Sequence, residues 1–331
     1  MVEKRYSLVF AREAYASLLC ASLDGPCAVV TSRAELVPAL TKRRPVVVFV
    51  DLDLLPQIDG AVTQVVTIVA ILDGTLEQIA MTFTRFPWLS HVVSVAMLAT
   101  PQARAHLAAL RERLEHGPQQ HVLGSAGLGR VALLTSSNRR EARFERLREF
   151  FSIQNLSPRA ISSMNDVAEE LVTNALYDAP LEAGYFKTAV PRTEDVELPP
   201  EHACEISYGF EDRRTFVRIR DPFGALTRSR LLGVLNRCNT TGVPLDESRG
   251  GAGLGLWRVF SSASTLTITV IAGRLTDVLV WVAPTRNRAV GKQLHAVHLF
   301  FPEEHSLDGA RSRFAADHDH DLIDESFTAV V

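Results

Sequence analysis

The sequence predicts a two-domain α/β protein, and two patterns of apolar residues support this fold class. In residues 1–117, short runs rich in valine and isoleucine alternate with helical patterns, which is typical of a parallel sheet covered on both faces. In residues 130–302, strand and helix patterns alternate less regularly, and we expect a mixed sheet backed on one face by helices. A chain of 331 residues with 47% apolar residues can form two such cores.

The composition favours a soluble cytoplasmic protein. A formal net charge of −3 provides no basic surface for phosphate neutralisation, so we expect no direct nucleic-acid partner. The longest apolar runs, 46–50 and 65–72, are too short to span a membrane, and the first residues lack a signal-peptide core. The four cysteines lack C-x-x-C spacing, and we expect buried thiols in a reducing compartment. These cysteines are Cys20, Cys27, Cys204 and Cys238.

Five strands and four helices alternate in the first 117 residues. The expected strands are 6–11, 27–31, 46–50, 65–72 and 92–98. The expected helices are 12–23, 33–42, 76–86 and 101–114. Such a flavodoxin-like sheet binds ligands at the carboxyl ends of its strands, and Asp51 and Asp53 follow the third strand.

This layout resembles the receiver domain of bacterial response regulators, with Asp51 near the position of the phosphoacceptor. In that family, acidic residues after the first strand hold Mg²⁺, and a hydroxyl residue and a lysine follow the fourth and fifth strands. Here the same strands end in Ala11-Arg12-Glu13, Leu72-Asp73 and Leu98-Ala99. A lone carboxylate leaves the charge of an incoming phosphoryl group uncompensated. The resemblance therefore implies a degenerate receiver, or pseudo-receiver, that docks proteins; a sheet without a signalling role is the alternative.

Two segments lie outside the expected domains. Residues 118–129 contain breakers and few apolar residues, so we expect a linker. Residues 303–331 are rich in acids, and we expect a disordered tail, with metal binding by the run 318–321 as the alternative. His106, in the helix before the linker, lacks the surroundings of a phosphoaccepting histidine, and we expect a solvated residue.

The helix that begins near Ser157 carries the first candidate site residues. Ser157 and Pro158 supply an N-cap and a first-turn proline. Glu170 and Asn174 are four residues apart, so their side chains lie on one face of this helix. A carboxylate can orient a nucleophile and an amide oxygen can bind a hard cation. The alternative is a surface hydrogen bond.

Two further motifs lie at a strand end and at a helix start. The expected strand 216–220 ends in Asp221-Pro222-Phe223-Gly224, which presents one acid beside a turn. The segment 249–257, RGGAGLGLW, is a glycine-dense turn that leads into a helical pattern. Without Cβ atoms, successive N–H groups can converge on an anion, and the helix start adds its positive dipole end. We expect phosphate to bind there; a turn that serves only packing is the alternative.

The remaining elements complete the second domain. We expect the strands 130–135, 204–210, 216–220, 266–271, 278–282 and 295–301. We expect the helices 141–151, 158–178 and 227–236. Residues 179–203 contain four prolines and are expected to form a surface excursion.

Together the three motifs resemble the Bergerat-fold (GHKL) ATP-binding domain shared by gyrase, Hsp90, histidine kinases and MutL. The run Glu170 to Ala175 is similar to the N box of that family, Asp221 to Gly224 to its first glycine box, and Gly251 to Leu256 to its second. The order and spacing match over about half of the chain. The strand–helix–helix start at Arg130, without a histidine-bearing hairpin, is most similar to the anti-sigma factor serine kinases.

The resemblance implies ATP and Mg²⁺ as ligands. Asp221 would accept a hydrogen bond from the adenine amino group, Asn174 would ligate Mg²⁺, and Glu170 would act as the general base. Residues 226–249 would form a lid. The other implied nucleotide-binding positions are Gly224, Arg249, Gly251, Gly253, Leu254 and Gly255.

Two departures from the family pattern leave two functions open. Phe223 stands where the first glycine box has glycine, and Tyr177-Asp178 stands where relatives place Lys or His, so a cationic phosphate contact is missing. The first function is a bacterial signalling kinase that phosphorylates serine or threonine on a partner protein, or a weak ATPase. The second is a non-catalytic, ATP-gated adaptor that docks proteins through the lid and the pseudo-receiver. Both need a protein partner, and homodimerisation is left open.

Overall fold

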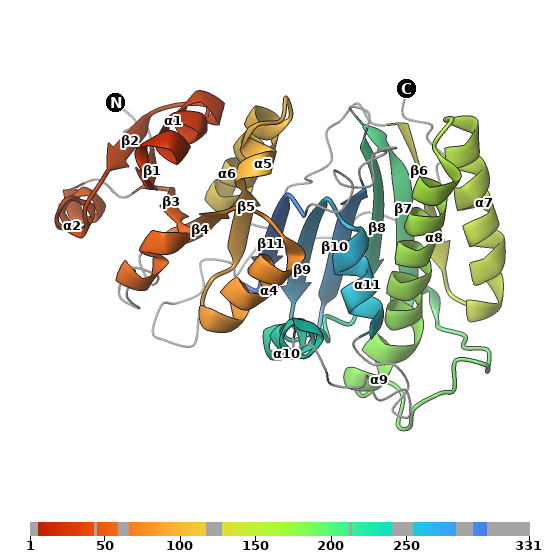
Figure 1. Ribbon diagram of the computed structural model, residues 1–331. Coiled ribbons are helices and arrows are strands. Elements are labelled where there is room, and N and C mark those ends of the chain that lie inside the picture. The colour runs from red at the N-terminus through yellow and green to blue at the C-terminus, as the bar shows by residue number, and fades with distance from the viewer. Residues whose placement is uncertain are drawn as a thin grey trace.

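One mixed sheet of eleven strands is the backbone of the protein. The computed structural model describes residues 6–42, 45–58, 66–116, 128–211, 214–239, 254–282 and 294–302. Within them the strand order is β2-β1-β3-β4-β5-β11-β9-β10-β8-β7-β6 (Figure 1). The protein is thus an α/β protein with a large mixed sheet and flanking helices.

The first five strands are parallel to one another. They are β1 (Ser7–Phe10), β2 (Cys27–Val30), β3 (Val47–Asp51), β4 (Thr67–Leu72) and β5 (His91–Ser94). The helices between and after them are α1 (Glu13–Ser22), α2 (Arg33–Lys42), α4 (Leu76–Arg85), α5 (Val95–Leu98) and α6 (Ala103–His116). The predicted strand 92–98 is wrong beyond Ser94, because the Ser94 side chain accepts the Met97 N–H and caps the short helix α5.

The second half contributes six strands. They are β6 (Leu128–Leu134), β7 (Cys204–Glu211), β8 (Arg214–Asp221), β9 (Thr265–Ile271), β10 (Leu275–Val282) and β11 (Ala296–Phe300). Its longer helices are α7 (Arg140–Ile153), α8 (Pro158–Thr173), α10 (Arg228–Asn239) and α11 (Leu254–Ser262). None of the helices in the described ranges has the length and apolar character needed to cross a membrane.

Strand β11 joins the two halves. It pairs with β5 in antiparallel register, with His298 opposite His91, and with β9 in parallel register, with His298 opposite Thr267. The sheet is therefore continuous from the first 117 residues into the residues after 128. Since β11 lies near the end of the described chain, this pairing connects segments about 200 residues apart.

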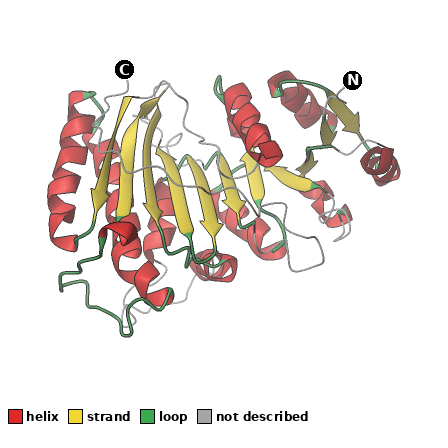
Figure 2. Ribbon diagram, turned by 180° about the vertical axis from the view of Figure 1, so that it is seen from behind, coloured by secondary structure: helices red, strands yellow, loops and turns green. Residues whose placement is uncertain are grey.

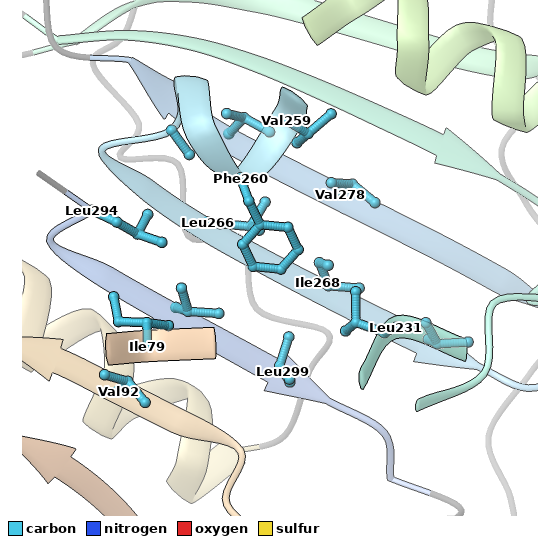
Figure 3. Packing of buried hydrophobic residues seen from close by; sticks show 14 of the residues in the cluster. Ile79, Val92, Leu231, Val259, Phe260, Leu266, Ile268, Val278, Leu294 and Leu299 are labelled. Atoms are coloured by element: carbon cyan, nitrogen blue, oxygen red, sulfur yellow. The ribbon is translucent and has the colours of Figure 1, made fainter. Parts of the chain in front are cut away.

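A single apolar core covers one face of this sheet from end to end. It includes Ile79 of α4 and Val92 of β5 together with Leu231 of α10, Phe260 of α11 and Leu299 of β11 (Figure 3). On the opposite face a second cluster packs α1, α5 and α6 on the first five strands (Figure 2). The two halves thus share the core on the first of these faces.

Arg228, at the start of α10, fastens that helix to the first half. The side chain is 9% exposed, and its guanidinium donates to Pro87 O at 2.8 Å, to Ser90 Oγ at 3.1 Å and to Leu89 O. These three acceptors belong to the segment between α4 and β5. Because the buried guanidinium has three acceptors in this segment, it fixes the position of α10 relative to the first half.

A cluster of histidines lies where α6 crosses the β5–β11 pair. His91 and His298 are each 3% exposed, and His298 Nε2 lies 2.9 Å from His106 Nε2. Arg113 of α6 lies over the Phe300 ring at 4.3 Å and donates to Thr269. The prediction of a solvated His106 was wrong, because its partner is far away in the sequence.

We expect acidification to destabilise the protein through this cluster. Burial lowers the pKa of His298 well below its usual value and that of His106 to about 4, whereas histidines in an unfolded chain titrate near pH ~6.5. As the pH falls from about 6.5 towards 4, the unfolded chain binds protons that the folded chain does not, so the free energy of unfolding decreases. The decrease should reach about 2 kcal/mol for a fully buried histidine by about pH 5.

Urea unfolding at about pH 7.5 and about pH 5 measures this dependence. His298→Gln should weaken the pH dependence, whereas His116→Gln, on the exposed last turn of α6, should leave it unchanged. An equal loss of stability in the parent and in His298→Gln would contradict the assignment.

Candidate functional site

Residues from each of the three sequence motifs line one cleft. It lies between α8, the ends of β8 and β10, and helices α10 and α11, and it has about 750 Å³ of empty space, including the part open to solvent. Its polar lining residues are Glu170, Asn174, Asp178, Glu182, Arg192, Asp221, Arg230 and Thr276. Its apolar lining includes Ile219, Leu226, Val234, Leu256 and Val278. The cleft is therefore apolar along its walls and charged at one end.

Helix α8 and the turn after it present two of these residues. The Ser157 side chain accepts the Ala160 N–H, which begins the helix where the sequence predicts. After Thr173 the backbone widens into a π-helical turn, Asn174–Asp178, followed by α9 (Ala179–Glu182). The chain is thus helical to 178 as predicted, but its last five residues, Asn174–Asp178, are π-helical and not α-helical. π-Helical turns are frequent at functional sites, and this one directs Asn174 and Asp178 to the cleft while Tyr177 stays in the core.

Asp221 provides a buried carboxylate at the end of β8. It is 7% exposed, and its Oδ1 accepts the Phe223 N–H at 3.0 Å. Burial raises its pKa to about 6. Thr276 of β10 lies directly opposite Asp221 in the sheet register and also lines the cleft. Sequence reasoning missed Thr276 because the predicted strand began at Val278, three residues after the observed start of β10.

Glu170 lies against the backbone at the start of α11. A Cβ atom on Gly255 would be 1.5 Å from Glu170 Oε1, so only glycine allows this carboxylate its position. Burial raises the pKa of Glu170, and the positive charges of Arg192 and Arg258 oppose that rise. Glu170 and the second glycine motif, 85 positions apart in the sequence, are therefore in contact.

Gly224 is required for a different reason. Its φ is +56°, in the left-handed region, and a Cβ there would be 2.1 Å from the carbonyl oxygen of Ile271. Phe223, beside it, is 5% exposed and stacks on His202 at 5.1 Å. The side chain of Phe223, where the resemblance led us to expect glycine, thus packs within the protein.

Two arginines supply positive charge to the cleft. Arg192 lies 3.3 Å from Asp178 Oδ2, and Arg230 of α10 forms an ion pair with Glu182. Arg192 belongs to the predicted surface excursion, which packs back on the protein through Val196 and Leu198, both buried. Sequence reasoning missed both cations because neither lies in a motif.

A second, polar cavity borders the same part of α8 and has about 650 Å³ of empty space, including the part open to solvent. Glu170 and Arg192 line both cavities. The remaining lining residues are Arg140, Asp166, Glu169, Thr173 and Arg258. Glu170 therefore borders both a mainly apolar cleft and a charged one.

The structure describes only some of the other predicted site residues. Leu254 is the first residue of α11, while Arg249, Gly251 and Gly253 lie outside the described residues, as do positions 240–249 of the predicted lid and nearly all of the predicted linker and tail. Among the described residues no group of three or more His, Cys, Asp or Glu has the arrangement of a metal site. A cation in the cleft would therefore depend on Asn174 together with ligand oxygens.

Asp51, the phosphoacceptor-like residue, is neutralised from within the chain. It is 1% exposed, and Arg12 Nε donates to its Oδ2 at 2.5 Å. Arg12 also pairs with Asp53 at 3.0 Å. The partner of Asp51 among the described residues after β1 is thus a guanidinium and not a metal-binding acid.

We expect Gly224→Ala to destabilise the protein by about 3 to 5 kcal/mol, because backbone strain and a backbone clash combine. Gly273 is the matched control, since its φ is +66° but nothing lies within 4 Å of the place that a Cβ atom would take. Gly273→Ala should therefore cost only the backbone strain, about 1 to 2 kcal/mol. Denaturant unfolding of both variants gives the comparison; equal losses would show that the contact with Ile271 O is unimportant.

Comparison with known proteins adds little to this geometry. No protein-family model and no curated protein matches the sequence. A chain of the solved SiaB-SiaC complex from Pseudomonas aeruginosa is 14% identical, and the alignment covers 53% of this chain and 96% of that chain with a TM-score of 0.32. A TM-score this low does not show a shared fold.

Proposed function

We propose that the protein binds Mg-ATP in this cleft and uses it to control a partner protein in bacterial signalling, by phosphorylating a serine or threonine of that partner. One observation carries the proposal: Glu170, Asn174, Asp221 and Leu256, from three motifs far apart in the sequence, line one cleft, and Gly255 lies against Glu170. The Bergerat-type resemblance assigns these residues to ATP binding. In the first half, the strand order β2-β1-β3-β4-β5 supports the prediction of a flavodoxin-like sheet.

The buried end of the cleft has the chemistry that adenine requires. Asp221 offers a carboxylate acceptor for the amino group, and Thr276 beside it offers a hydroxyl. Ile219 and Val278 provide apolar walls for a flat ring. A few polar groups fixed within an apolar cleft are typical of small-molecule sites.

The charged end suits a triphosphate with its cation. Asn174 would hold Mg²⁺ through its amide oxygen, with phosphate oxygens and water as the other ligands, because Mg²⁺ in nucleotide sites has few protein ligands. The bound cation would offset negative charge on the phosphates. Arg192 and Arg230 lie in the same cleft and can exchange their carboxylate partners for phosphate oxygens.

The polar cavity beside Glu170 provides an approach for the acceptor hydroxyl. A hydroxyl entering there would reach Glu170, which lines both cavities, so that the carboxylate can accept its proton as it attacks. Arg140 and Arg258 at this cavity would contact acidic residues of the partner.

A non-catalytic adaptor is the second candidate, and one observation favours it. Helix α10 lines the cleft through Arg230 and Val234 and is fastened to the first half through Arg228. Nucleotide in the cleft would thereby bias the position of α4 and β5 without any transfer of phosphate. The neutralised Asp51 accords with a docking role for that half.

Asp221→Asn should weaken ATP binding by about 1 to 3 kcal/mol, because a hydrogen bond to a charged acceptor is lost in a buried position. The ATP affinity of the parent should also decrease below about pH 6, where the raised pKa of Asp221 leaves the carboxyl protonated. Calorimetry with Mg-ATP measures both effects, with Asp195→Asn, an exposed change outside both cavities, as control. Equal affinities for Asp221→Asn and the parent would remove Asp221 from the adenine role.

Glu170→Ala separates the kinase from the adaptor. If Glu170 is the general base, its removal should lower phosphate transfer from labelled ATP to a candidate partner by about 10²- to 10⁴-fold while ATP still binds. Asn174→Ala should impair both functions, and Glu145→Ala, exposed on α7, should impair neither. A Glu170→Ala protein that binds ATP and still supports full signalling would exclude the kinase and favour the adaptor.

A further inference from the structure

Two cysteines at the outer edge of the sheet lie in contact. Cys20 in α1 and Cys27 at the start of β2 have their Sγ atoms 2.6 Å apart. Both are partly exposed and both are free thiols. The prediction of buried, unrelated cysteines was therefore wrong for this pair, whereas Cys204 is fully buried.

Hydrogen bonds from other parts of the chain hold the backbone between the two cysteines in place. Ser7 N donates to Pro26 O at 3.0 Å, beside the pairing of β1 with β2. Arg111 of α6 donates to Asp24 O at 2.8 Å, and Arg104 donates to Ala21 O at 3.2 Å. The backbone thus holds the thiols together before any bond forms between them, so oxidation requires little rearrangement.

We propose that Cys20 and Cys27 form a redox modification site, which a hydroperoxide converts to an intramolecular disulfide and which thiols reduce again. Partial exposure allows a small oxidant to reach the pair, and the neighbouring thiol competes with further oxidation. The other described cysteine, Cys204 on β7, is fully buried, and no second thiol lies beside it among the described residues.

The reaction balances with a hydroperoxide as the oxidant. Cys20 Sγ, as the thiolate, attacks the terminal peroxide oxygen; the O–O bond breaks, and a sulfenic acid and an alcohol or water form. Cys27 Sγ then displaces water from the sulfenic sulfur, which forms the S–S bond. Two thiols are oxidised by two electrons and one peroxide is reduced. Burial and the hydrogen bond with Cys20 raise the pKa of Cys27 to about 12, which assigns Cys27 to the second, resolving step.

Counting free thiols after peroxide treatment tests the proposal. The full chain carrying Cys238→Ser is treated with hydrogen peroxide, quenched with catalase, denatured and labelled with N-ethylmaleimide. The reduced protein has three thiols to label, and the oxidised protein should have one, on Cys204. Peptide mapping should find Cys20 linked to Cys27, and dithiothreitol should restore three labels.

Two variants make the result specific. In Cys27→Ser the sulfenic acid of Cys20 should persist and react with dimedone, whereas Cys20→Ser should give neither a disulfide nor a dimedone adduct. Three labels after treatment with excess peroxide, or conversion of Cys20 to sulfinic acid in the presence of Cys27, would overturn the proposal.

Discussion

The pairing of β11 with both β5 and β9 is the interaction on which the rest of the structure depends. It turns two groups of strands into one sheet and places α10 and α11 beside α4 over a common core. Arg228 can reach Pro87 and Ser90 only in that arrangement. Because α10 also forms a wall of the cleft, the shape of the cleft depends on residues of the first half that do not line it.

The geometry of the cleft depends on two glycines, at positions where a side chain would not fit. Gly224 brings the turn after Asp221 against β9, and Gly255 leaves room for the Glu170 carboxylate. Arg192 and Arg230 form ion pairs with Asp178 and Glu182, and Glu170 and Asp221 leave the lining of the cleft with more negative than positive charge. Such a site favours ligands that carry both an anionic part and a cation over a bare anion.

The sequence predicts much of the fold because most of its signals are local. Val47–Asp51 and Thr67–Leu72 are continuous apolar runs, and Ser157 with Pro158 marks the start of α8. The motif residues that meet in the cleft were also all visible in the sequence. What sequence reasoning missed depends on long-range contacts: the β5–β11 pairing, the partner of His106, and Arg192 in the cleft. Helix α5 was missed because the apolar pattern of 92–98 continues past the end of β5, and Thr276 was missed because the apolar run 278–282 begins after the start of β10.

The late position of β11 also has a consequence during synthesis. Strand β5 is complete at Ser94, but its partner begins at Ala296, about 200 residues later, which a ribosome needs about 10 to 40 s to translate. During that interval β5 is an open edge that other strands can join. A nascent chain therefore needs protection at this edge, from a chaperone or from its own local structure, until its last described strand emerges.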